Sequence, residues 1–273
     1  INEGQFEMLA KLEFNFDQQK ELKNYCDSKN IEFLSSAFDL ESLNLIKNLN
    51  IKRYKIPSGE ITSLPYLRSV ASEQKPIILS TGMSDMKEIG DALDQLTFSG
   101  VKNKDITILH CTTEYPAPLE DVNLNAMLTI RDKFRIKVGY SDHTLGTEVS
   151  LAAVALGATI IEKHLTLDRN LNGPDHKASL EPEEFLNLVE GIRKISKSLG
   201  SFEKKITNSE QKNLPIVRKS ITAKTEIKKG ELFSSNNICS KRPGTGISPM
   251  LWDQVVGKRA KRDFKFNDQI TLN

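Results

Sequence analysis

The sequence predicts an α/β protein: a (β/α)8 TIM barrel, of which this chain carries six strand-and-helix units, followed by a small, mostly β module. Short apolar segments alternate with helical patterns from residue 31 to about residue 200. Polar residues gather where nearly all of these segments end. The alternation is typical of a parallel sheet covered by helices, and the polar ends are typical of the mouth of a barrel.

Six segments are expected to be strands because they are short and mostly apolar, as strands buried on both faces are. They span residues 31–35, 53–57, 76–80, 106–111, 137–141 and 159–163. A closed barrel has eight strands, so we expect the chain to start after the first two. An open doubly wound sheet would fit six strands without that assumption and stays the alternative.

Helices are expected between these strands because apolar residues recur there at helical spacing. The helical patterns span residues 40–49, 86–96, 120–134, 147–156 and 182–199. A further helix is expected over residues 5–28, which carry Phe6, Leu12, Phe14, Leu22 and Tyr25 at suitable spacing.

The chain has the composition of a globular protein that does not bind nucleic acid. Its 273 residues include 38 basic and 36 acidic side chains, a formal net charge of +2, and no long basic stripe. No apolar run approaches the roughly 20 residues of a membrane span, so no membrane partner is expected. The odd number of cysteines, three, argues against a disulfide framework and favours a cytoplasmic location.

The alternation of strands and helices stops after Leu199-Gly200. The sequence therefore predicts two domains joined by a linker: a barrel over residues 1–200, a polar linker over residues 201–214 and a compact β module over residues 215–273. The module is small enough to need a docking surface or a partner for support.

Three strand ends carry groups that could hold an anion. Lys55, Ser58 and Glu60 follow one strand, and Ser80 ends the next in a run of Ser, Thr and Gly. Ser36 occupies a similar position after the first expected strand. Lysine and hydroxyl groups suit a phosphate or carboxylate. Ordinary turns and helix caps, with Asp39 as one candidate, are the alternative explanation.

Two histidines, His143 and His164, stand at the ends of consecutive predicted strands. Positions two apart on a strand share a face, so Ser141 and His143 can point into the barrel, as can Glu162 and His164. Adjacent strand ends meet at the mouth of a barrel, which makes a shared divalent metal the first hypothesis. A hydrogen-bonded polar layer is the alternative.

Four further residues flank this region. His110 lies within its strand and is expected to be a satisfied interior histidine rather than a ligand. Thr112 and Tyr115 are better placed to reach a substrate, and Asp175 could contact a sugar hydroxyl.

Read in order, these blocks resemble the sialic acid synthases, the family that makes N-acetylneuraminic, legionaminic and pseudaminic acids. The matching blocks are Phe38-Asp39, residues 55–60, Ser80-Thr81-Gly82-Met83, residues 110–116, Ser141-Asp142-His143, Glu162-Lys163-His164, residues 173–176 and residues 241–244. The C-terminal module resembles the antifreeze-like (SAF) domain of that family. The sequence departs from the family pattern at Ser36-Ala37, where Thr-Pro is usual, and at Thr112, where some members have Asn.

The resemblance implies an enzyme, a transferase that forms a carbon–carbon bond between phosphoenolpyruvate and an N-acetylmannosamine-type aldehyde and releases phosphate. It implies that His143 and His164 hold Mn²⁺, or another divalent metal such as Mg²⁺ or Co²⁺. Glu60 and Asp175 would hold sugar hydroxyls, and Arg242 would reach the sugar site of a partner in a domain-swapped homodimer. The implied contacts to phosphoenolpyruvate are Ser36, Lys55, Ser58, Ser80, Thr112 and Ser141.

Three alternatives stay open at this point. A legionaminate synthase would use a 2,4-diacetamido-trideoxy sugar in the same reaction. A non-catalytic sugar-binding barrel would keep the fold without the chemistry. A metal-dependent aldolase would share the barrel but release no phosphate.

Overall fold

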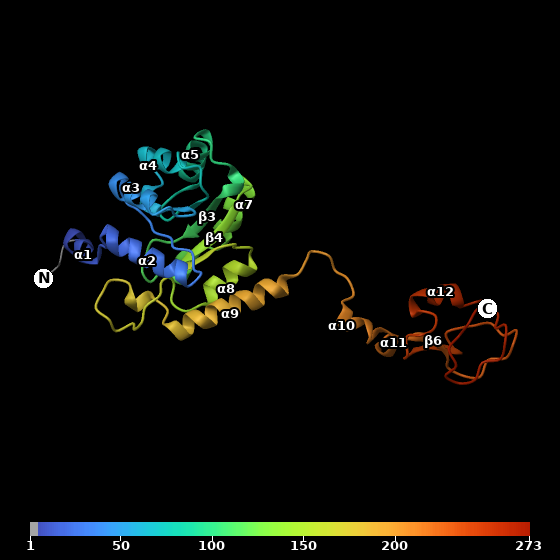
Figure 1. Cartoon of the computed structure of the whole chain (residues 1–273). Coiled ribbons are helices and arrows are strands. Elements are labelled where there is room, and N and C mark those ends of the chain that lie inside the picture. Colours follow the sequence, from blue (N-terminus) through green and yellow to red (C-terminus); the bar gives the residue numbers. More distant parts are fainter. Residues whose placement is uncertain (1–4) are drawn as a thin grey trace. The chain divides into compact units, whose positions relative to one another are not determined.

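The computed structural model describes residues 5–273 and divides into two compact units, one ending at Gly200 and the other running from Ser201 to Asn273. The first four residues of the expected barrel domain lie outside this range. The first unit is built around a parallel sheet of five strands in the order β1-β2-β3-β4-β5 (Figure 1). This curved parallel sheet confirms the partial (β/α)8 barrel predicted from the sequence.

The five strands follow the chain order, as they do in a barrel. They are β1 (Tyr54–Ile56), β2 (Ile77–Ser80), β3 (Ile106–Cys111), β4 (Lys137–Asp142) and β5 (Ile161–Lys163). Leu79 pairs with Ile108, which in turn pairs with Val138, so the carboxyl ends of all the strands point the same way. Gly139 permits the approach of β5, because a Cβ there would lie 2.5 Å from the carbonyl oxygen of Ile160.

Helices cover the outer face of this sheet (Figure 1). Packing between neighbours links α4 to α5, α7 to β3 and β4, and α8 to both β4 and α9. The helices of the unit are α1 (Gln5–Leu12), α2 (Phe16–Ser28), α3 (Leu40–Asn48), α4 (Leu64–Ala71), α5 (Met86–Phe98), α6 (Leu119–Val122), α7 (Asn125–Phe134), α8 (Glu148–Ala155) and α9 (Pro182–Leu199), with the 3₁₀ turns η1 (Ser58–Glu60), η2 (Asn103–Asp105) and η3 (His176–Ala178).

Local capping explains where three of these helices begin. Asp39 caps α3 by accepting a hydrogen bond from the Ser42 amide, so the capping interpretation of this aspartate is confirmed. Asp85 and Glu88 form a capping box at the start of α5. The start of α9 combines a capping box with Pro182 in the first turn, where proline needs no hydrogen-bond partner.

The two faces of the sheet differ in chemistry. Side chains that alternate along the strands, such as Ile77, Leu79, Ile106, Ile108 and Val138, form one buried apolar core with the helices. The side chains at the alternate positions of the same strands point into the barrel, and those near the carboxyl ends of the strands are polar. The helices therefore stabilise one face while the opposite face is left for chemistry.

The strand expected over residues 31–35 is wrong. Residues 31–35 form no strand, although Phe33 packs against the core and Glu32 pairs with Arg53, and the neighbouring Ser36 makes a single parallel bridge to Lys55. A longer ladder would need residues 50–53 as its partner, but these form a turn in which Asn50 has a positive φ of 51°. Apolar residues alone do not make a strand when no extended partner is available.

Two expected helices are interrupted and one was missed. Residues 120–134 divide into α6 and α7 because Asn123 takes the left-handed conformation, with φ 43°. Residues 5–28 divide into α1 and α2, and Asn15 begins the second with a capping box to Gln18. Helix α4 is not among the helices expected from the sequence, and it follows directly from the turn at residues 58–63.

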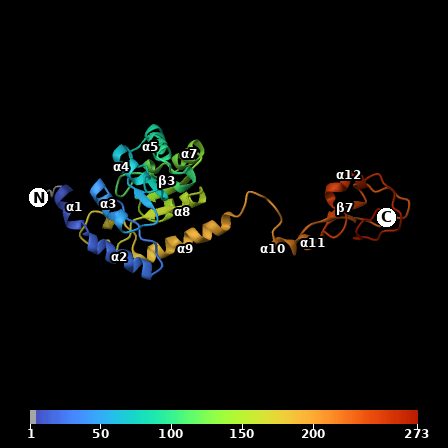
Figure 2. The same ribbon diagram turned by 45° about the horizontal axis from the view of Figure 1, so that its top comes forward.

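The second unit is a small β module with its own core. The strands β6 (Ser220–Ala223) and β7 (Ile238–Lys241) pair antiparallel, and an isolated bridge joins Thr222 of β6 to Gln269 near the C-terminus. Phe233 and Phe264 pack edge to face in the core, with ring centres 5.7 Å apart. The unit also contains α10 (Asn208–Gln211), α11 (Leu214–Val217), η4 (Pro249–Leu251) and α12 (Trp252–Val255), and Figure 2 shows α12 beside this sheet.

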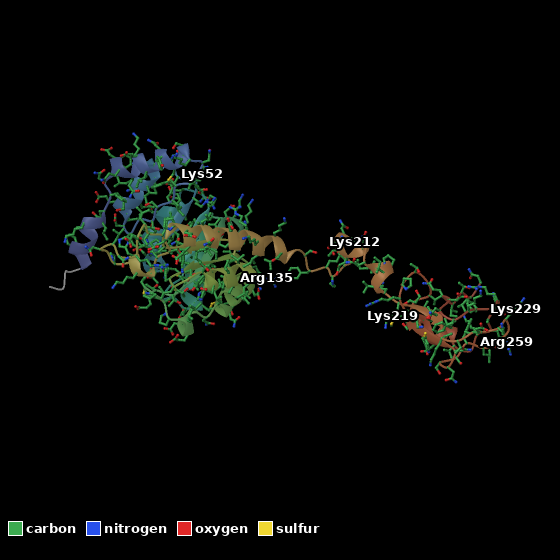
Figure 3. The ribbon with its side chains drawn as sticks, turned by 90° about the horizontal axis from the view of Figure 1, so that it is seen from below. Lys52, Arg135, Lys212, Lys219, Lys229 and Arg259 are labelled. Carbon is green, nitrogen blue, oxygen red and sulfur yellow. The ribbon has the colours of Figure 1, made fainter. Side chains whose placement is uncertain are left out.

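The labelled cations are dispersed on the first unit, but Lys229 and Arg259 lie close together on the second (Figure 3), where Lys258 and Lys261 line the same pocket. Lys52 and Arg135 lie apart on the first unit, as do Lys219 and Lys229 on the second (Figure 3). All three cysteines are free thiols. Within residues 5–273, no helix is both long and apolar enough to cross a lipid bilayer.

The apolar core between sheet and helices should carry most of the stability of the first unit. Leu79 has no exposed surface, so Leu79→Ala should lower the free energy of unfolding by about 2–5 kcal/mol through lost contacts and a cavity. Urea denaturation followed by circular dichroism measures this. Leu119, which is 68% exposed, supplies the matched control, and Leu119→Ala should stay within about 0.5 kcal/mol of wild type. Equal losses for both leucines would contradict this assignment of the core.

Candidate functional site

A polar cluster lies on the inner face of the sheet, where β1, β2, β4 and β5 end. Parallel pairing brings these side chains together: Lys55 is paired in register beside β2, and Ser141 lies opposite Glu162. The chain positions span more than 100 residues, so only the parallel pairing of the strands makes them neighbours. The members on the inner face are Lys55, Ser80, Ser141, His143, Glu162 and His164.

Glu162 is the central acceptor of this cluster. Its Oε2 lies 3.2 Å from Nζ of Lys55, whose side chain is only 9% exposed. Its Oε1 accepts a hydrogen bond of 2.7 Å from the hydroxyl of Ser141. The carboxylate thus compensates a largely buried cation, which would otherwise be costly in this environment. Two donors suited to an anion, Lys55 and Ser141, share one carboxylate.

A second group of small side chains surrounds Gly82. The amide of Gly82 donates to the hydroxyl of Ser58 at 2.9 Å, and that hydroxyl lies 3.4 Å from Sγ of Cys111. A Cβ at position 82 would lie only 2.1 Å from Oγ1 of Thr113. Glycine is therefore required here, because any side chain would displace the hydroxyls of Thr113 and Ser58.

Ser80 is the one buried serine in the described chain whose hydroxyl makes no hydrogen bond with a described residue. It ends β2 on the inner face and is 3% exposed. The next residue, Thr81, instead satisfies its hydroxyl by donating to the carbonyl of Leu109 at 2.9 Å. Buried hydroxyls are normally hydrogen-bonded, so the Ser80 hydroxyl is suited to bind a ligand.

The two histidine rings converge. Their centres lie 5.6 Å apart with the planes at 89°. His143 Nδ1 lies 2.6 Å from the carbonyl oxygen of Thr112, which can only accept, so the proton sits on Nδ1. Burial lowers the pKa of His143 below its ordinary value, which favours the neutral ring.

The donor set fits a divalent metal. An imidazole centre lies about 3 Å from a cation bound through its nitrogen, so two rings on one cation lie at most about 6 Å apart. The Nε2 atom of His143 lies 3.2 Å from the Ser141 hydroxyl, but that hydroxyl gives its proton to Glu162. The Nε2 lone pair is therefore not occupied by Ser141. Among residues 5–273, no group of three or more His, Cys, Asp or Glu side chains forms a metal site, so protein ligands beyond the two histidines are not indicated.

Aromatic and acidic groups flank the histidines. The Tyr115 ring lies 4.2 Å from the ring of His143 and 5.4 Å from that of His164, centre to centre. Burial raises the pKa of Tyr115, so its hydroxyl remains protonated at neutral pH. Asp175 Oδ2 lies 3.6 Å from His164 Nδ1, beside the histidine. His176 supports the same loop through its contact with the Thr166 hydroxyl at 2.7 Å.

Three expected site residues of the first unit, Ser36, Glu60 and Thr112, make no side-chain hydrogen bond or ion pair with the described members of this cluster, and a fourth, Arg242, belongs to the second unit. The Thr112 hydroxyl turns outward and donates to the Asp121 carbonyl at 3.1 Å, so only the Thr112 carbonyl reaches the site. Ser36 lines a cavity of about 660 Å³ between α2 and α3, although it bridges Lys55 through its backbone. Glu60 is half-buried in η1, where its charge adds to burial in raising the pKa of Tyr66. Arg242 belongs to the second unit, where its Nε donates to the Val217 carbonyl at 2.8 Å.

Sequence reasoning missed two features of the site. Thr113, and not Thr112, directs its hydroxyl toward Gly82 and Ser58. A count of alternating positions from Cys111 would have favoured Thr113, since residues two apart share a face. Glu162 was expected to point inward, but its bridging contact to Lys55 depends on two strands that do not adjoin in the sheet.

Comparison with known proteins finds matches to two family models and to several relatives. The model of the NeuB family matches residues 1–204, and the model of the SAF domain matches residues 218–273. N,N'-diacetyllegionaminic acid synthase of Campylobacter jejuni is 54% identical over 269 residues, which cover 98% of this chain and 80% of that protein. N-acetylneuraminate-9-phosphate synthase of Homo sapiens is 36% identical over 263 residues, which cover 95% of this chain and 72% of that protein.

A solved structure agrees with the sequence comparisons. The N-acetylneuraminic acid synthetase of Leptospira borgpetersenii, crystallised in complex with citrate, superposes with a TM-score of 0.71 at 36% identity. The superposition covers 76% of this chain and 71% of that chain.

His110 should act as a structural histidine. Burial lowers its pKa, and its Nε2 lies 2.8 Å from the Val122 carbonyl. Because the folded-state pKa lies below that of the unfolded chain, His110 contributes stability that is complete above the unfolded pKa and is lost as pH falls through the folded one. Replacing it by glutamine should therefore reduce the loss of stability that accompanies a fall in pH below about 6.5, the ordinary histidine pKa. Urea unfolding at several pH values tests this, and an unchanged slope for His110→Gln would contradict it.

Proposed function

The chain belongs to the NeuB family, and from that premise we propose that it condenses phosphoenolpyruvate with the open-chain aldehyde of an amino sugar, releasing phosphate and forming a nine-carbon 2-keto sugar acid. The observation that carries this proposal is the inner-face cluster, in which a buried lysine, several hydroxyls and two converging histidines meet at the strand ends. Such an arrangement offers donors for an anion beside a place for a Lewis acid.

The anionic substrate would lie against Lys55, Ser80 and Ser141, with Ser58 and the neighbouring Thr113 completing the hydroxyl side. Ser80 supports this because its buried hydroxyl makes no hydrogen bond with a described residue. Lys55 is paired with Glu162 in this structure. The anionic substrate would therefore share the ammonium group with Glu162, or Glu162 would move away. Ser36 and Thr112 were proposed for the same ligand, and for Thr112 only the backbone carbonyl lies in the site.

In the proposed reaction C3 of phosphoenolpyruvate attacks the aldehyde carbon, and the former carbonyl oxygen takes up a proton. Water then adds to the oxocarbenium carbon C2 and loses a proton, and the tetrahedral intermediate expels phosphate by breaking the C2–O bond. The ammonium group of Lys55 would stabilise negative charge as it moves toward the phosphate. Neutral His143, fixed by its bond to Thr112, would hold its ring in one orientation throughout.

His143 and His164 would hold Mn²⁺ or another divalent metal, such as Mg²⁺ or Co²⁺. The metal, when bound, would polarise the aldehyde oxygen of the sugar as a Lewis acid. Tyr115 would form one wall beside both rings, and Glu60 and Asp175 remain candidates to hold sugar hydroxyls. We also propose that Arg242 reaches the sugar site of a second copy in a domain-swapped homodimer, and that the enzyme acts in the cytoplasm, which its free thiols favour.

The diacetamido sugar is the better-supported substrate. The resemblance by itself favours N-acetylmannosamine, but the relative at 54% identity is a diacetyllegionaminic acid synthase, whereas the N-acetylneuraminate-9-phosphate synthase is 36% identical. We therefore put the 2,4-diacetamido-trideoxy sugar first and N-acetylmannosamine second. The non-catalytic sugar-binding barrel is the competing explanation.

A substrate panel decides between these sugars. With Mn²⁺ and phosphoenolpyruvate, the enzyme should release phosphate only when a sugar is added, and kcat/KM should be at least about tenfold higher for the diacetamido sugar, a difference of about 1.4 kcal/mol. A continuous phosphate assay provides the measurement. A preference for N-acetylmannosamine would overturn the substrate choice, and sugar binding without phosphate release from either sugar would favour the non-catalytic barrel.

The metal assignment has its own test. His143→Ala and His164→Ala should each abolish Mn²⁺-dependent phosphate release and weaken Mn²⁺ binding, because each removes an imidazole ligand. His110→Gln, which changes a histidine bonded to the Val122 carbonyl, is the matched control and should bind Mn²⁺ as wild type does. Unchanged Mn²⁺ affinity in both alanine variants would refute the assignment.

A further inference from the structure

We propose that the buried ion pair between Asp142 and Lys163 is a positioning device that sets the distance and orientation between His143 and His164. This inference rests on the proposed function, because it assumes that the two rings share a metal. Neither Asp142 nor Lys163 needs to touch substrate or metal for this role, so both are positioning residues rather than catalytic ones.

The pair sits at the last rung of the ladder between β4 and β5. Asp142 and Lys163 are register partners, and each is followed directly by one of the two histidines. Beyond this rung the two strands exchange no further ladder bonds, so the backbone pairing does not fix the histidines relative to each other. The side chains of Asp142 and Lys163 lie 3.1 Å apart, Oδ2 to Nζ, and thereby tie the two strands at the point where the ladder stops.

Asp142 also fixes the residue on the far side of His143. Its Oδ1 accepts hydrogen bonds from both the amide and the hydroxyl of Thr144, at 2.9 and 2.7 Å. Its Oδ2 accepts a hydrogen bond from the Ser150 hydroxyl in α8. The Lys163 ammonium group also donates a hydrogen bond to the carbonyl of Thr144. The backbone of Thr144, which follows His143, is therefore bound to one carboxylate and one ammonium group.

Each histidine has one further backbone tie. The His143 carbonyl accepts from the Ala117 amide at 2.9 Å, and the His164 carbonyl accepts from the Leu180 amide at the same distance. These bonds hold each residue to its own loop. They do not connect one histidine to the other. Two side-chain links join the two strand ends: the Ser141–Glu162 hydrogen bond of 2.7 Å on the inner face and, one rung later, the Asp142–Lys163 pair, which directly precedes both histidines.

Burial argues that orientation, rather than stability, is the main contribution of the pair. The side chains are 0% and 1% exposed. Desolvation of two charges offsets most of their attraction, and well-packed apolar residues commonly serve stability as well or better. An ion pair with four additional hydrogen bonds instead fixes the positions of both strand ends. Residues that hydrogen-bond to metal ligands orient those ligands in the same way.

Lys163→Met tests the proposal by Mn²⁺ titration, with free Mn²⁺ read from its electron paramagnetic resonance signal. The Kd for Mn²⁺ should rise by about 10- to 100-fold, the usual effect of removing a group that orients a metal ligand. If the ion pair only stabilised the fold, the variant would bind fewer Mn²⁺ ions per chain, in proportion to the unfolded fraction. The Kd of its folded fraction would then equal that of wild type. Asp142→Asn/Lys163→Met leaves no unpaired buried charge and should show the same rise if the single variant does not fold.

Two controls make each outcome decisive. Lys47→Met breaks a half-buried pair with Glu73 elsewhere in the first unit and should leave the Kd unchanged. His143→Ala should lose Mn²⁺ in the same assay. An unchanged Kd in the folded fraction of both Lys163 variants, together with loss in His143→Ala, would overturn the positioning role alone. Wild-type affinity in His143→Ala would overturn the metal site and the positioning role together.

Discussion

Parallel pairing of neighbouring strands is the constraint on which the rest of this structure depends. It places the carboxyl ends of β1 to β5 at one edge, so residues as distant as Lys55 and Glu162 lie 3.2 Å apart. The same pairing lets alternate residues divide between two faces, an apolar one against the helices and a polar one at the site. Stability and chemistry therefore use different side chains of the same short strands, and a change on one face need not disturb the other.

The charges at the strand ends are balanced in two pairs, one on each face of the strands. Glu162 compensates Lys55 and orders Ser141, while Asp142 and Lys163 pair one position away and face the opposite side of the strands. Strand alternation separates these two pairs, because successive residues point in opposite directions. The inner-face pair includes the partly exposed Glu162, whereas the pair on the opposite face is fully buried and closed by bonds to Thr144 and Ser150. This division suits a site in which one group of charges binds and another holds the histidines in place.

The sequence predicted those elements whose signals are local. Helix α9 was predicted with its observed bounds because Pro182 and the repeated apolar positions mark its start and its face. Strand β3 matched as well, since residues 106–111 are apolar and flanked by turns. Residues 31–35 failed for a non-local reason, because the turn at residues 50–53 offers no extended partner. The break at Asn123 was also invisible, since an asparagine within a helical pattern only occasionally takes the left-handed conformation.

By itself the sequence determined the fold class, the inward direction of the two histidines and the resemblance that leads to the family. These follow from periodicity and from the order of residue types, which are properties of the chain alone. Only the tertiary structure decided which hydroxyl reaches the site, Thr113 rather than Thr112, and that Glu162 joins Lys55 to Ser141. Such contacts depend on strand curvature and on the last rung of the ladder between β4 and β5. Neither is encoded in the spacing of any one segment, because both arise from how several segments pack together.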